Sequence, residues 1–290
     1  MRFPLLCRLV LATGWGMGAG CGAAADRTAP PPAVSAGDED SARGRPGSAI
    51  DAVRTTLAAE GEAAVGPWGA LVASEDRAEQ DRALDAGRRP AELLAFMGIA
   101  PGMRVAEIAA GTGYTTELLA RAVGEQGRVY AVNNRFVLER FAEGPWSERL
   151  KKGVMKNVTR LDREFDDPLP AEVSELDLVC NILFYHDSVW MQTDRVAMNA
   201  AVFRALRPGG TYVVVDHSAA TGHGVEDAKT LHRIEAKVVR SEIEAAGFVF
   251  VEQSPFLKNS ADARDWNAAP SAAADRRGTS DRFALKFRRP

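Results

Sequence analysis

Residues 105–114 read VAEIAAGTGY. The first half is a short apolar run of strand length, and the second half is a turn that contains Gly111 and Gly113. Glycine lets the backbone come close to a ligand, and a helix that begins after such a turn presents its free N–H groups there. A dinucleotide-binding fingerprint needs a third glycine, and Thr116 stands at that position. The stretch therefore predicts a strand, a ligand-binding turn and a helix, with the acidic Glu107 four positions before the turn.

Short apolar runs and helical patterns alternate on both sides of this turn. Strands are expected at residues 104–109, 129–132, 158–161, 178–183, 212–215, 248–252 and 283–287, and helices at 75–86, 90–97, 115–123, 191–206 and 229–246. This alternation implies a parallel sheet with helices on both faces. The last two strands have no helix between them, so the final one can run antiparallel. The predicted fold class is α/β, with a Rossmann-like, doubly wound, mostly parallel sheet of seven strands and an antiparallel last strand.

Composition narrows the possible partners. The chain has 290 residues and a formal net charge of −3, and its Lys and Arg residues are spread along the sequence. This distribution argues against a nucleic-acid partner. Of the three cysteines, Cys7 and Cys21 lie near the start, so Cys180 is alone in the predicted domain. Cys180 lies in an apolar run and is expected to be a small buried hydrophobic residue.

The first 25 residues have the pattern of a secretory signal peptide. Arg2 and Arg8 flank a short apolar start, and residues 9–18 are apolar or small, which is too short for a membrane span. Cys21 follows small residues, as the lipidated cysteine of a lipoprotein does, and residues 23–25 offer an ordinary cleavage site instead. We therefore expect an exported protein, either periplasmic or held at the membrane only by an N-terminal lipid. A misassigned start codon would make it cytoplasmic.

Two segments lie between this leader and the main domain, which spans residues 90–290. Residues 26–48 are rich in Pro, Gly, Ser, Ala and acidic residues, and they predict a disordered linker. Residues 49–89 are expected to form an N-terminal helical segment. Its charged part, residues 75–89, fits either a solvated helix face or a lid over a ligand, and the sequence leaves both interpretations open.

The chain resembles the class I S-adenosylmethionine-dependent methyltransferases, whose first motif is an acidic residue followed by alternating glycines. Here Ala109 replaces the first glycine of that motif. Further matches follow in order along the chain, at LDLV (176–179), LRPGGT (206–211) and EAAGF (244–248). Within this class the chain is most similar to a bacterial, exported group of predicted methyltransferases that carries YHD (185–187) and DH (216–217) motifs. The resemblance covers about residues 90–290, and it implies S-adenosylmethionine as the cofactor.

The resemblance also implies which residues contact the cofactor. Glu107 would lie near its amino-acid part, and the turn would contribute Ala109, Gly111, Gly113 and Tyr114. The ribose hydroxyls usually meet an acidic residue at the end of the second strand, but this chain has Asn133 there. Asp166 or Asp167 is expected at the adenine, although both also fit a solvated acidic loop.

The four histidines are His186, His217, His223 and His232. Two of them follow the fourth and fifth strands directly, so His186 and His217 are expected at the rim of one pocket, with His232 on the next helix closing over it. His186 is the first candidate for a general base and His217 the second, because an imidazole titrates near neutral pH. Tyr185 and Asp187 are the candidate orienting groups. A structural hydrogen-bond network and a metal site are alternatives, but no metal site is predicted, because no helical pair of histidines four residues apart and no cysteine ligand supports one.

The function predicted from these residues is methyl transfer from S-adenosylmethionine to a small molecule. One rival is a non-catalytic exported binding protein that keeps the fold, because little of this cofactor is expected outside the cytoplasm. Another is an NADP-dependent oxidoreductase, because Asn133 and Arg135 would suit a 2′-phosphate. The sequence predicts neither the methyl acceptor nor the oligomeric state.

Overall fold

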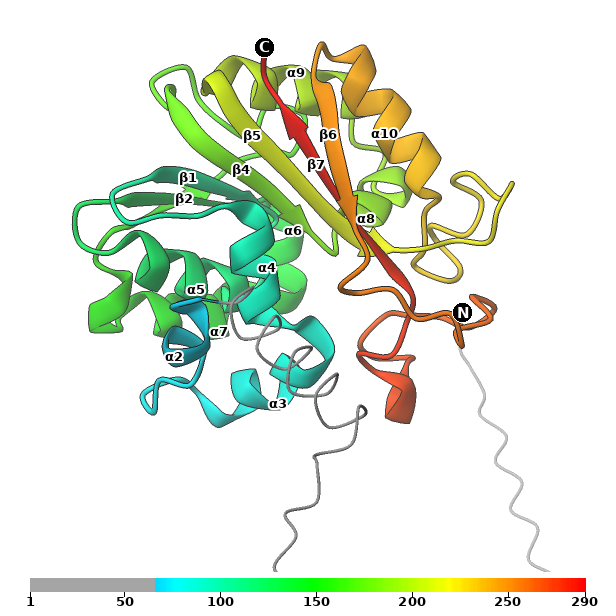
Figure 1. The fold of residues 1–290 in the computed structure, drawn as a ribbon, viewed down its shortest axis with the longest axis horizontal. Helices are drawn as coiled ribbons and strands as arrows, with labels where there is room; N and C mark the ends of the chain where they lie inside the picture. The colour runs from blue at the N-terminus through cyan, green and yellow to red at the C-terminus, as the bar shows by residue number, and fades with distance from the viewer. Residues whose placement is uncertain (1–65) are drawn as a thin grey trace, which may run out of the picture. The chain divides into compact units, whose positions relative to one another are not determined.

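A seven-stranded sheet forms the centre of the computed structural model, which describes residues 66–290 (Figure 1). The strand order is β3-β2-β1-β4-β5-β7-β6. The strands are β1 (Arg104–Ile108), β2 (Arg128–Asn133), β3 (Val158–Asp162), β4 (Leu176–Ile182), β5 (Leu206–His217), β6 (Val249–Ser254) and β7 (Arg282–Arg288). The last strand, β7, pairs antiparallel with both β5 and β6, whereas the pairs from β3 to β5 are parallel. The predicted fold class is therefore confirmed, including the antiparallel last strand.

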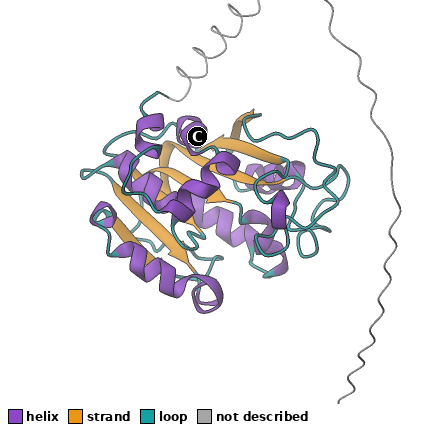
Figure 2. Ribbon diagram, turned by 90° about the horizontal axis from the view of Figure 1, so that it is seen from below, coloured by secondary structure: helices purple, strands orange, loops and turns teal. Residues whose placement is uncertain are grey.

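Helices cover both faces of the sheet (Figure 2). Those before β4 are α2 (Trp68–Val72), α3 (Glu79–Arg88), α4 (Pro90–Met97), α5 (Tyr114–Val123), α6 (Arg135–Val137), the π-helix η1 (Leu138–Ala142), α7 (Glu143–Leu150) and the 3₁₀ helix η2 (Gly153–Met155). Those after it are α8 (Tyr185–Trp190), α9 (Arg195–Ala205), α10 (Ala236–Ala245) and the 3₁₀ helix η3 (Ala274–Arg276).

Two expected helices differ from the structure. The helix expected at 191–206 begins only at Arg195, because Asp194 caps α9 by accepting a hydrogen bond from the Ala197 N–H, and a separate helix, α8, precedes it. The helix expected at 229–246 begins only at Ala236, and residues 229–235 form a loop. This loop carries His232, which takes a left-handed backbone conformation with φ 52°.

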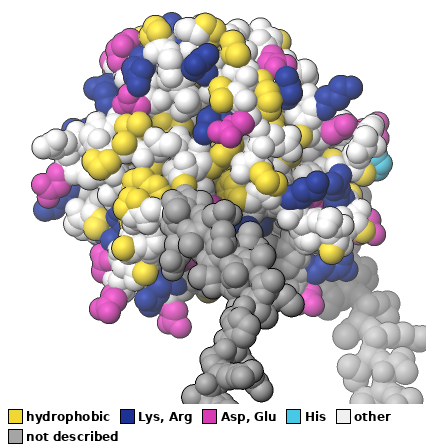
Figure 3. Space-filling view, viewed as in Figure 1, with side chains coloured by type: hydrophobic (Ala, Val, Ile, Leu, Met, Phe, Trp, Pro, Cys, Tyr) yellow, Lys and Arg dark blue, Asp and Glu magenta, His cyan; other side chains and the backbone are white. Residues whose placement is uncertain are grey.

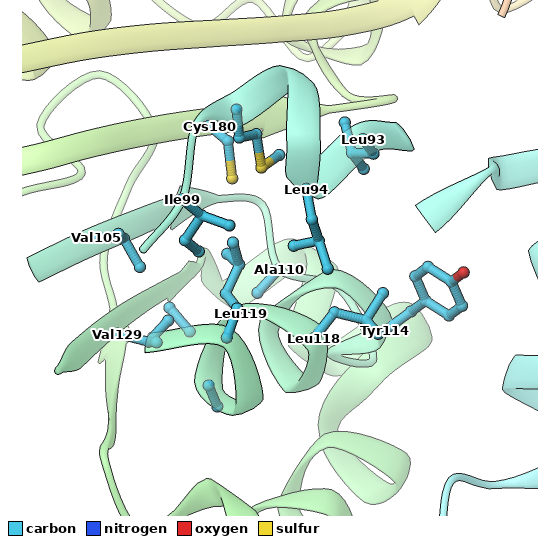
Figure 4. Packing of buried hydrophobic residues seen from close by; sticks show 14 of the residues in the cluster. Leu93, Leu94, Ile99, Val105, Ala110, Tyr114, Leu118, Leu119, Val129 and Cys180 are labelled. Carbon is cyan, nitrogen blue, oxygen red and sulfur yellow. The ribbon is translucent and has the colours of Figure 1, made fainter. Parts of the chain in front are cut away.

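Alternating strand residues feed two separate apolar cores. Val105 and Cys180 face one core together with α4, α5 and α7, whereas Ala106, Ile108 and Val179 face the other together with α9 and α10. Figure 4 shows Cys180 among apolar side chains of the first core, where it is fully buried. Burial raises the pKa of the Cys180 thiol well above its usual value, so the expectation of an unreactive, buried cysteine agrees with its position.

The strand order reverses between β1 and β4. To one side of this point the chain continues outward to β2 and β3, and to the other side to β5, β7 and β6. In open α/β sheets, ligands bind beyond the carboxyl ends of the strands at such a reversal. The turn after β1 and the start of α8 after β4 therefore mark the place where a site is expected.

The predictions for the first 65 residues lie outside the described part of the chain. They are the signal peptide with Cys21, the linker 26–48 and residues 49–65 of the helical segment 49–89. Within residues 66–290, no helix is both long and apolar enough to cross a membrane. On the face shown in Figure 3, basic and acidic side chains are interspersed.

Candidate functional site

The turn after β1 bends through three residues with positive φ. They are Ala109 at 59°, Gly111 at 56° and Gly113 at 86°. An L-residue in the left-handed region costs about 1–2 kcal/mol, so Ala109 holds a conformation that the glycine of the resembling motif would adopt without that cost. A Cβ added to Gly111 would meet no atom within 4 Å. The turn is therefore open at Gly111, where a side chain or a ligand would have room.

Gly113 has a different role from the one that the sequence suggested. A Cβ at this position would lie 2.4 Å from Trp146 Cζ3 and 2.8 Å from Arg149 Cδ. Trp146 is fully buried, so it cannot move aside easily. Gly113 thus allows α7 to pack against the turn, whereas the expectation was that its missing side chain makes room for the cofactor.

Glu107 lies behind the turn, 3% exposed. The hydroxyl of Thr116 donates a hydrogen bond to Glu107 Oε2. Burial raises the pKa of Glu107 to about 7, although hydrogen bonds from Thr116 and Thr115 act in the opposite direction. The residue at the third glycine position of a dinucleotide fingerprint therefore holds the acidic side chain in place, which explains why a threonine stands there.

Asn133 ends β2 and is fully buried beside the same turn. Its Oδ1 accepts a hydrogen bond from the Gly111 N–H at 2.8 Å, and its Nδ2 donates to the Gly111 carbonyl at 3.0 Å. A carboxylate could accept from the N–H but would repel the carbonyl oxygen. The side chain therefore fixes the turn, and its expected contact with a ribose stays a prediction.

The two aspartates expected at the adenine are exposed. Asp167 forms ion pairs with Arg163 and, at 3.4 Å, with Arg204. Between these aspartates and β3 lies Phe165, which is buried and packs against Phe184 at a ring distance of 4.4 Å. The structure thus favours the solvated-loop interpretation for Asp167, and the adenine contact of Asp166 stays a prediction.

Helix α3 packs against the residue that follows the turn. The Tyr114 hydroxyl, which points away from the apolar side chains in Figure 4, donates to Asp85 Oδ1 at 2.6 Å. Arg77 also pairs with Asp85, and Arg77 and Asp81 are only 3% and 5% exposed. These buried charges do not fit a solvated helix face. The other interpretation of residues 75–89, a lid over a ligand, stays a prediction.

Two arginines near the turn, Arg88 and Arg282, have no anionic partner in the described part of the chain. The Arg88 guanidinium lies over the Tyr114 ring at 4.3 Å, and Arg282 donates to the backbone carbonyls of Gly87 and Gly278. Among residues 66–290, neither has a carboxylate within ion-pair distance. Burial, together with the charge of Arg88, lowers the pKa of Arg282 to about 10. These two arginines were not predicted to lie together, because they are far apart in the chain.

At the other side of the strand reversal, His186 is the second residue of α8 and is 2% exposed. Its Nδ1 donates to Asp216 Oδ1 at 2.6 Å, and its backbone N–H donates to Asp216 Oδ2 at 2.7 Å. Burial lowers the pKa of His186, but Asp216 and Asp187 outweigh burial and raise it to about 10. His186 is therefore protonated at neutral pH without a metal, and this geometry does not support the predicted general base.

His186 and two neighbouring side chains bring three electron-pair donors together. His186 Nε2 lies 3.1 Å from Asp187 Oδ1 and 3.2 Å from His232 Nδ1, and the last two atoms are 3.1 Å apart. The predicted contact of Asp187 with His186 is thus present. His232 reaches the cluster from a loop, although the sequence placed it on a helix. Arg233 does not join it, because it is buried in an ion pair with Asp262.

His217 ends β5 as expected, with its ring 5.7 Å from that of His186. The sequence therefore placed these two histidines together correctly. His217 Nδ1 is hydrogen-bonded to Ser280 Oγ at 2.7 Å. Burial, followed by the charges of His186 and two nearby arginines, lowers the pKa of His217 well below its usual value, so this imidazole is neutral at pH 7.

Tyr185 does not orient an imidazole. Its hydroxyl donates to Glu242 at 2.8 Å and accepts from the Asn199 side chain at 2.8 Å. These partners lie on α10 and α9, so Tyr185 ties three helices together on the other side of α8. His223 is outside the cluster as well, since it is exposed and pairs with Asp227.

A 2′-phosphate site at the end of β2 is also not supported. Arg135 projects into solvent with 81% of its side chain exposed, and it pairs with Glu139 in the following helix. Asn134 is the cap of α6, where its side chain accepts from the Val137 N–H at 2.9 Å. Neither side chain faces the turn that would hold a pyrophosphate.

The known proteins to which this chain is similar include methyltransferases. The family of the protein-L-isoaspartate(D-aspartate) O-methyltransferases matches residues 76–159. The ubiquinone/menaquinone biosynthesis C-methyltransferase UbiE of Teredinibacter turnerae is 31% identical over 137 residues, which are 47% of this chain and 51% of that protein. UbiE of Shewanella halifaxensis is 30% identical over 122 residues, 42% of this chain and 45% of that protein. The chain thus spans about half the length of the curated relatives that it matches.

Solved structures agree with this fold. A SAM-dependent methyltransferase from Aquifex aeolicus superimposes with a TM-score of 0.50 at 19% identity, covering 72% of this chain and 96% of its own. A chain from the complex between the Haloferax volcanii Trm112 methyltransferase activator and a methyltransferase gives a TM-score of 0.51 at 18% identity, covering 73% and 93%. The chain therefore has the Rossmann-like fold of the class I S-adenosylmethionine-dependent methyltransferases.

Proposed function

We propose that this chain is an S-adenosylmethionine-dependent methyltransferase that acts on a small molecule. The observation that carries the proposal is the turn after β1, which is open at Gly111 and has the buried Glu107 behind it. Arg88 lies over the adjoining Tyr114 and Arg282 lies near Arg88, and neither has an anionic partner among residues 66–290. The methyltransferase relatives and the strand order support the same conclusion.

The charges around the turn match the amino-acid part of this cofactor. That part carries an ammonium and a carboxylate at neutral pH. An ionised Glu107 attracts the ammonium, and Arg88 offers a guanidinium that matches the geometry of a carboxylate. Arg282 adds positive charge near Arg88. A nicotinamide dinucleotide has no such zwitterion, and its pyrophosphate would meet the charge of Glu107.

The acceptor is proposed to bind at the ends of β4 and β5. A cleft of about 600 Å³ lies beyond the ends of β5 and β6 and is lined by Ser218, Arg264 and Arg282 among others. The lining begins at Ser218, directly after His217, and it includes no residue between β4 and β5. This volume is typical of a small-molecule site. Methyl transfer is an in-line displacement at the sulfonium, so the main task of the protein is to align donor and acceptor. The neutral His217 is the residue that we propose to face the acceptor.

The rival function as a binding protein and the export of the protein stand differently. The non-catalytic binding protein is disfavoured, because the relatives that match are methyltransferases. Export remains a proposal that rests on residues 1–25 alone, with the periplasm or a lipid-anchored state as the destination.

Calorimetry of the purified protein with S-adenosylhomocysteine and with NADPH tests the proposed cofactor. We expect S-adenosylhomocysteine to bind and NADPH not to bind. Gly111→Leu should weaken binding at least about tenfold, because the new side chain fills the open side of the turn. The matched control is Gly98→Leu, which has a similar φ of 67° and equally open surroundings but lies six residues before β1, near the opposite end of that strand. Equal binding by both variants, or tighter binding of NADPH, would contradict the proposal.

The pH dependence of binding tests the role of Glu107. Its pKa of about 7 means that the free protein holds this group protonated below neutral pH. An ammonium group binds the carboxylate and not the acid, so affinity for S-adenosylhomocysteine should rise about tenfold from pH 6 to pH 8. Glu107→Gln should bind more weakly and lose this dependence. A wild-type affinity that is flat over this range would show that Glu107 does not contact the ammonium.

A further inference from the structure

We infer that His186, Asp187 and His232 form a binding site for one divalent transition-metal ion of the Zn²⁺ type. The three donor atoms are His186 Nε2, Asp187 Oδ1 and His232 Nδ1, and their mutual distances are 3.1, 3.1 and 3.2 Å. They thus form a nearly equilateral triangle.

The size of this triangle is that of a metal-ligand face. With metal–ligand distances of about 2.05 Å, neighbouring ligand atoms are about 3.3 Å apart in a tetrahedral site and about 2.9 Å apart in an octahedral one. The observed distances fall between these values. An ion at about 2.05 Å from all three atoms would lie about 1 Å out of their plane. No rearrangement of the three side chains is needed to reach this geometry.

A metal ion would take the place of the proton that His186 Nε2 otherwise shares with Asp187 Oδ1, because the three atoms face one another. His186 Nδ1 donates to Asp216, so Nε2 carries a lone pair whenever His186 is neutral. That lone pair then faces the lone pairs of Asp187 Oδ1. His232 Nδ1 can donate a proton to Asp187 Oδ1 or to His186 Nε2, but not to both. A cation between them satisfies all three donors at once.

The surroundings are those that support a bound ion. The carboxylate of Asp216 is fully buried and holds the far nitrogen of His186, which fixes the orientation and raises the basicity of this ligand. The indole N–H of Trp190 donates to Asp187 Oδ1 at 2.7 Å and steadies the carboxylate. With the imidazole of His186 bound to the ion in its neutral form, the carboxylates of Asp187 and Asp216 carry two negative charges, which a divalent ion balances.

Two imidazoles and one carboxylate favour Zn²⁺ or a related transition metal over Mg²⁺ or Ca²⁺, which prefer oxygen ligands. Three protein ligands leave a coordination position open, as in catalytic zinc sites. His232 and Asp187 each keep about a quarter of their side-chain surface exposed, so this position can be reached from solvent.

The consequence for catalysis rests on the proposed function. A hydroxyl or thiol acceptor that coordinates the ion loses its proton to solvent more readily, because the cation stabilises the anion that remains. The acceptor oxygen or sulfur then forms a bond to the methyl carbon while the sulfonium C–S bond breaks, and its electron pair stays on the departing sulfur. In this arrangement the ion takes the place of the general base that the sequence assigned to His186.

Titration of the chelator-treated full-length protein with Zn²⁺ and with Co²⁺, without any cofactor, tests the site. We expect one ion per chain, a visible Co²⁺ absorption spectrum of a low-coordinate nitrogen and oxygen site, and no comparable binding of Mg²⁺. His232→Ala removes a partly exposed ligand. It should weaken binding by more than about 100-fold, beyond the effect usual for an outer-shell partner. Asp187→Asn should weaken it as well.

The matched control is His223→Ala, which removes an exposed histidine that also pairs with an aspartate. It should leave Zn²⁺ affinity and the Co²⁺ spectrum unchanged. Absence of binding to the folded wild type, an unchanged affinity in His232→Ala, or an equal loss in His223→Ala would overturn the site. Because no cofactor is present, failure here is distinguishable from failure of the proposed methyltransferase function.

Discussion

Gly113→Ala is expected to lower the free energy of unfolding by about 3 kcal/mol, a large effect for the addition of one methyl group. The new Cβ would lie 2.4 Å from Trp146 Cζ3, 2.7 Å from Cε3 and 2.8 Å from Arg149 Cδ. Overpacking of this kind costs about 1–3 kcal/mol. The left-handed φ of 86° adds about 1–2 kcal/mol for any L-residue. Chemical denaturation followed by tryptophan fluorescence measures the sum.

The control for this prediction is Gly111→Ala. Gly111 has a positive φ of 56° in the same turn, but its Cβ would meet no atom within 4 Å. This variant therefore carries only the backbone cost, about 1 kcal/mol. If the two variants were destabilised equally, the contact between Gly113 and Trp146 would have no energetic weight, and backbone strain alone would explain both.

Arg149→Met is expected to destabilise the protein by about 3–5 kcal/mol, because it leaves the buried carboxylate of Asp81 without its cation. Glu117, by contrast, keeps its ion pairs with Arg121 and Lys152. Arg149 is 8% exposed and binds Asp81 through two nitrogens, at 2.5 and 2.9 Å. Its Nη1 also lies 2.5 Å from Glu117, and its Nε donates to the Thr112 carbonyl at 2.7 Å. The residue thus joins α3, α5, α7 and the turn, so its loss should also loosen α3.

Comparison with an exposed pair isolates the effect of burial. Arg135→Met removes an arginine that also pairs with a glutamate, but 81% of the Arg135 side chain is exposed. Surface pairs contribute little, so this variant should keep the denaturation midpoint of the wild type. The double variant Arg149→Met, Asp81→Asn should recover part of the lost stability, because one unpaired charge is removed. An Arg149→Met variant as stable as Arg135→Met would contradict the argument.

The strands and the glycine turn could be predicted because their signals are local. A short apolar run and a positive-φ turn are both encoded by neighbouring residues, as in residues 105–114. The pairing of Arg149 with Asp81 could not be predicted, since the two residues are 68 positions apart. The same holds for Arg282, which approaches Gly87 across 195 positions.

The histidine cluster was partly predictable for a topological reason. His186 and His217 follow neighbouring parallel strands, so their proximity follows from the strand order. The directions of adjacent side chains did not follow. Successive residues on a helix point about 100° apart, so Tyr185 turns to α9 and α10 while His186 turns to Asp216. The contact of Asn133 with the turn was not predicted, because a hydrogen bond to a backbone turn leaves no mark in the sequence.

The reversal of strand order between β1 and β4 divides the sheet into two parts. The matched family region, residues 76–159, ends within β3 and so covers the part of the sheet that lies on the β1 side. Every member of the histidine cluster comes from the other part, after β4 or β5. Methyltransferases that share a methyl donor need the same donor pocket, whereas a different acceptor needs a different acceptor pocket. In the proposed function, the donor turn and the histidine cluster lie on opposite sides of this reversal, and Arg282 reaches the donor side from the start of β7. The acceptor pocket could therefore change while the turn after β1 is kept, provided that Arg282 is kept as well.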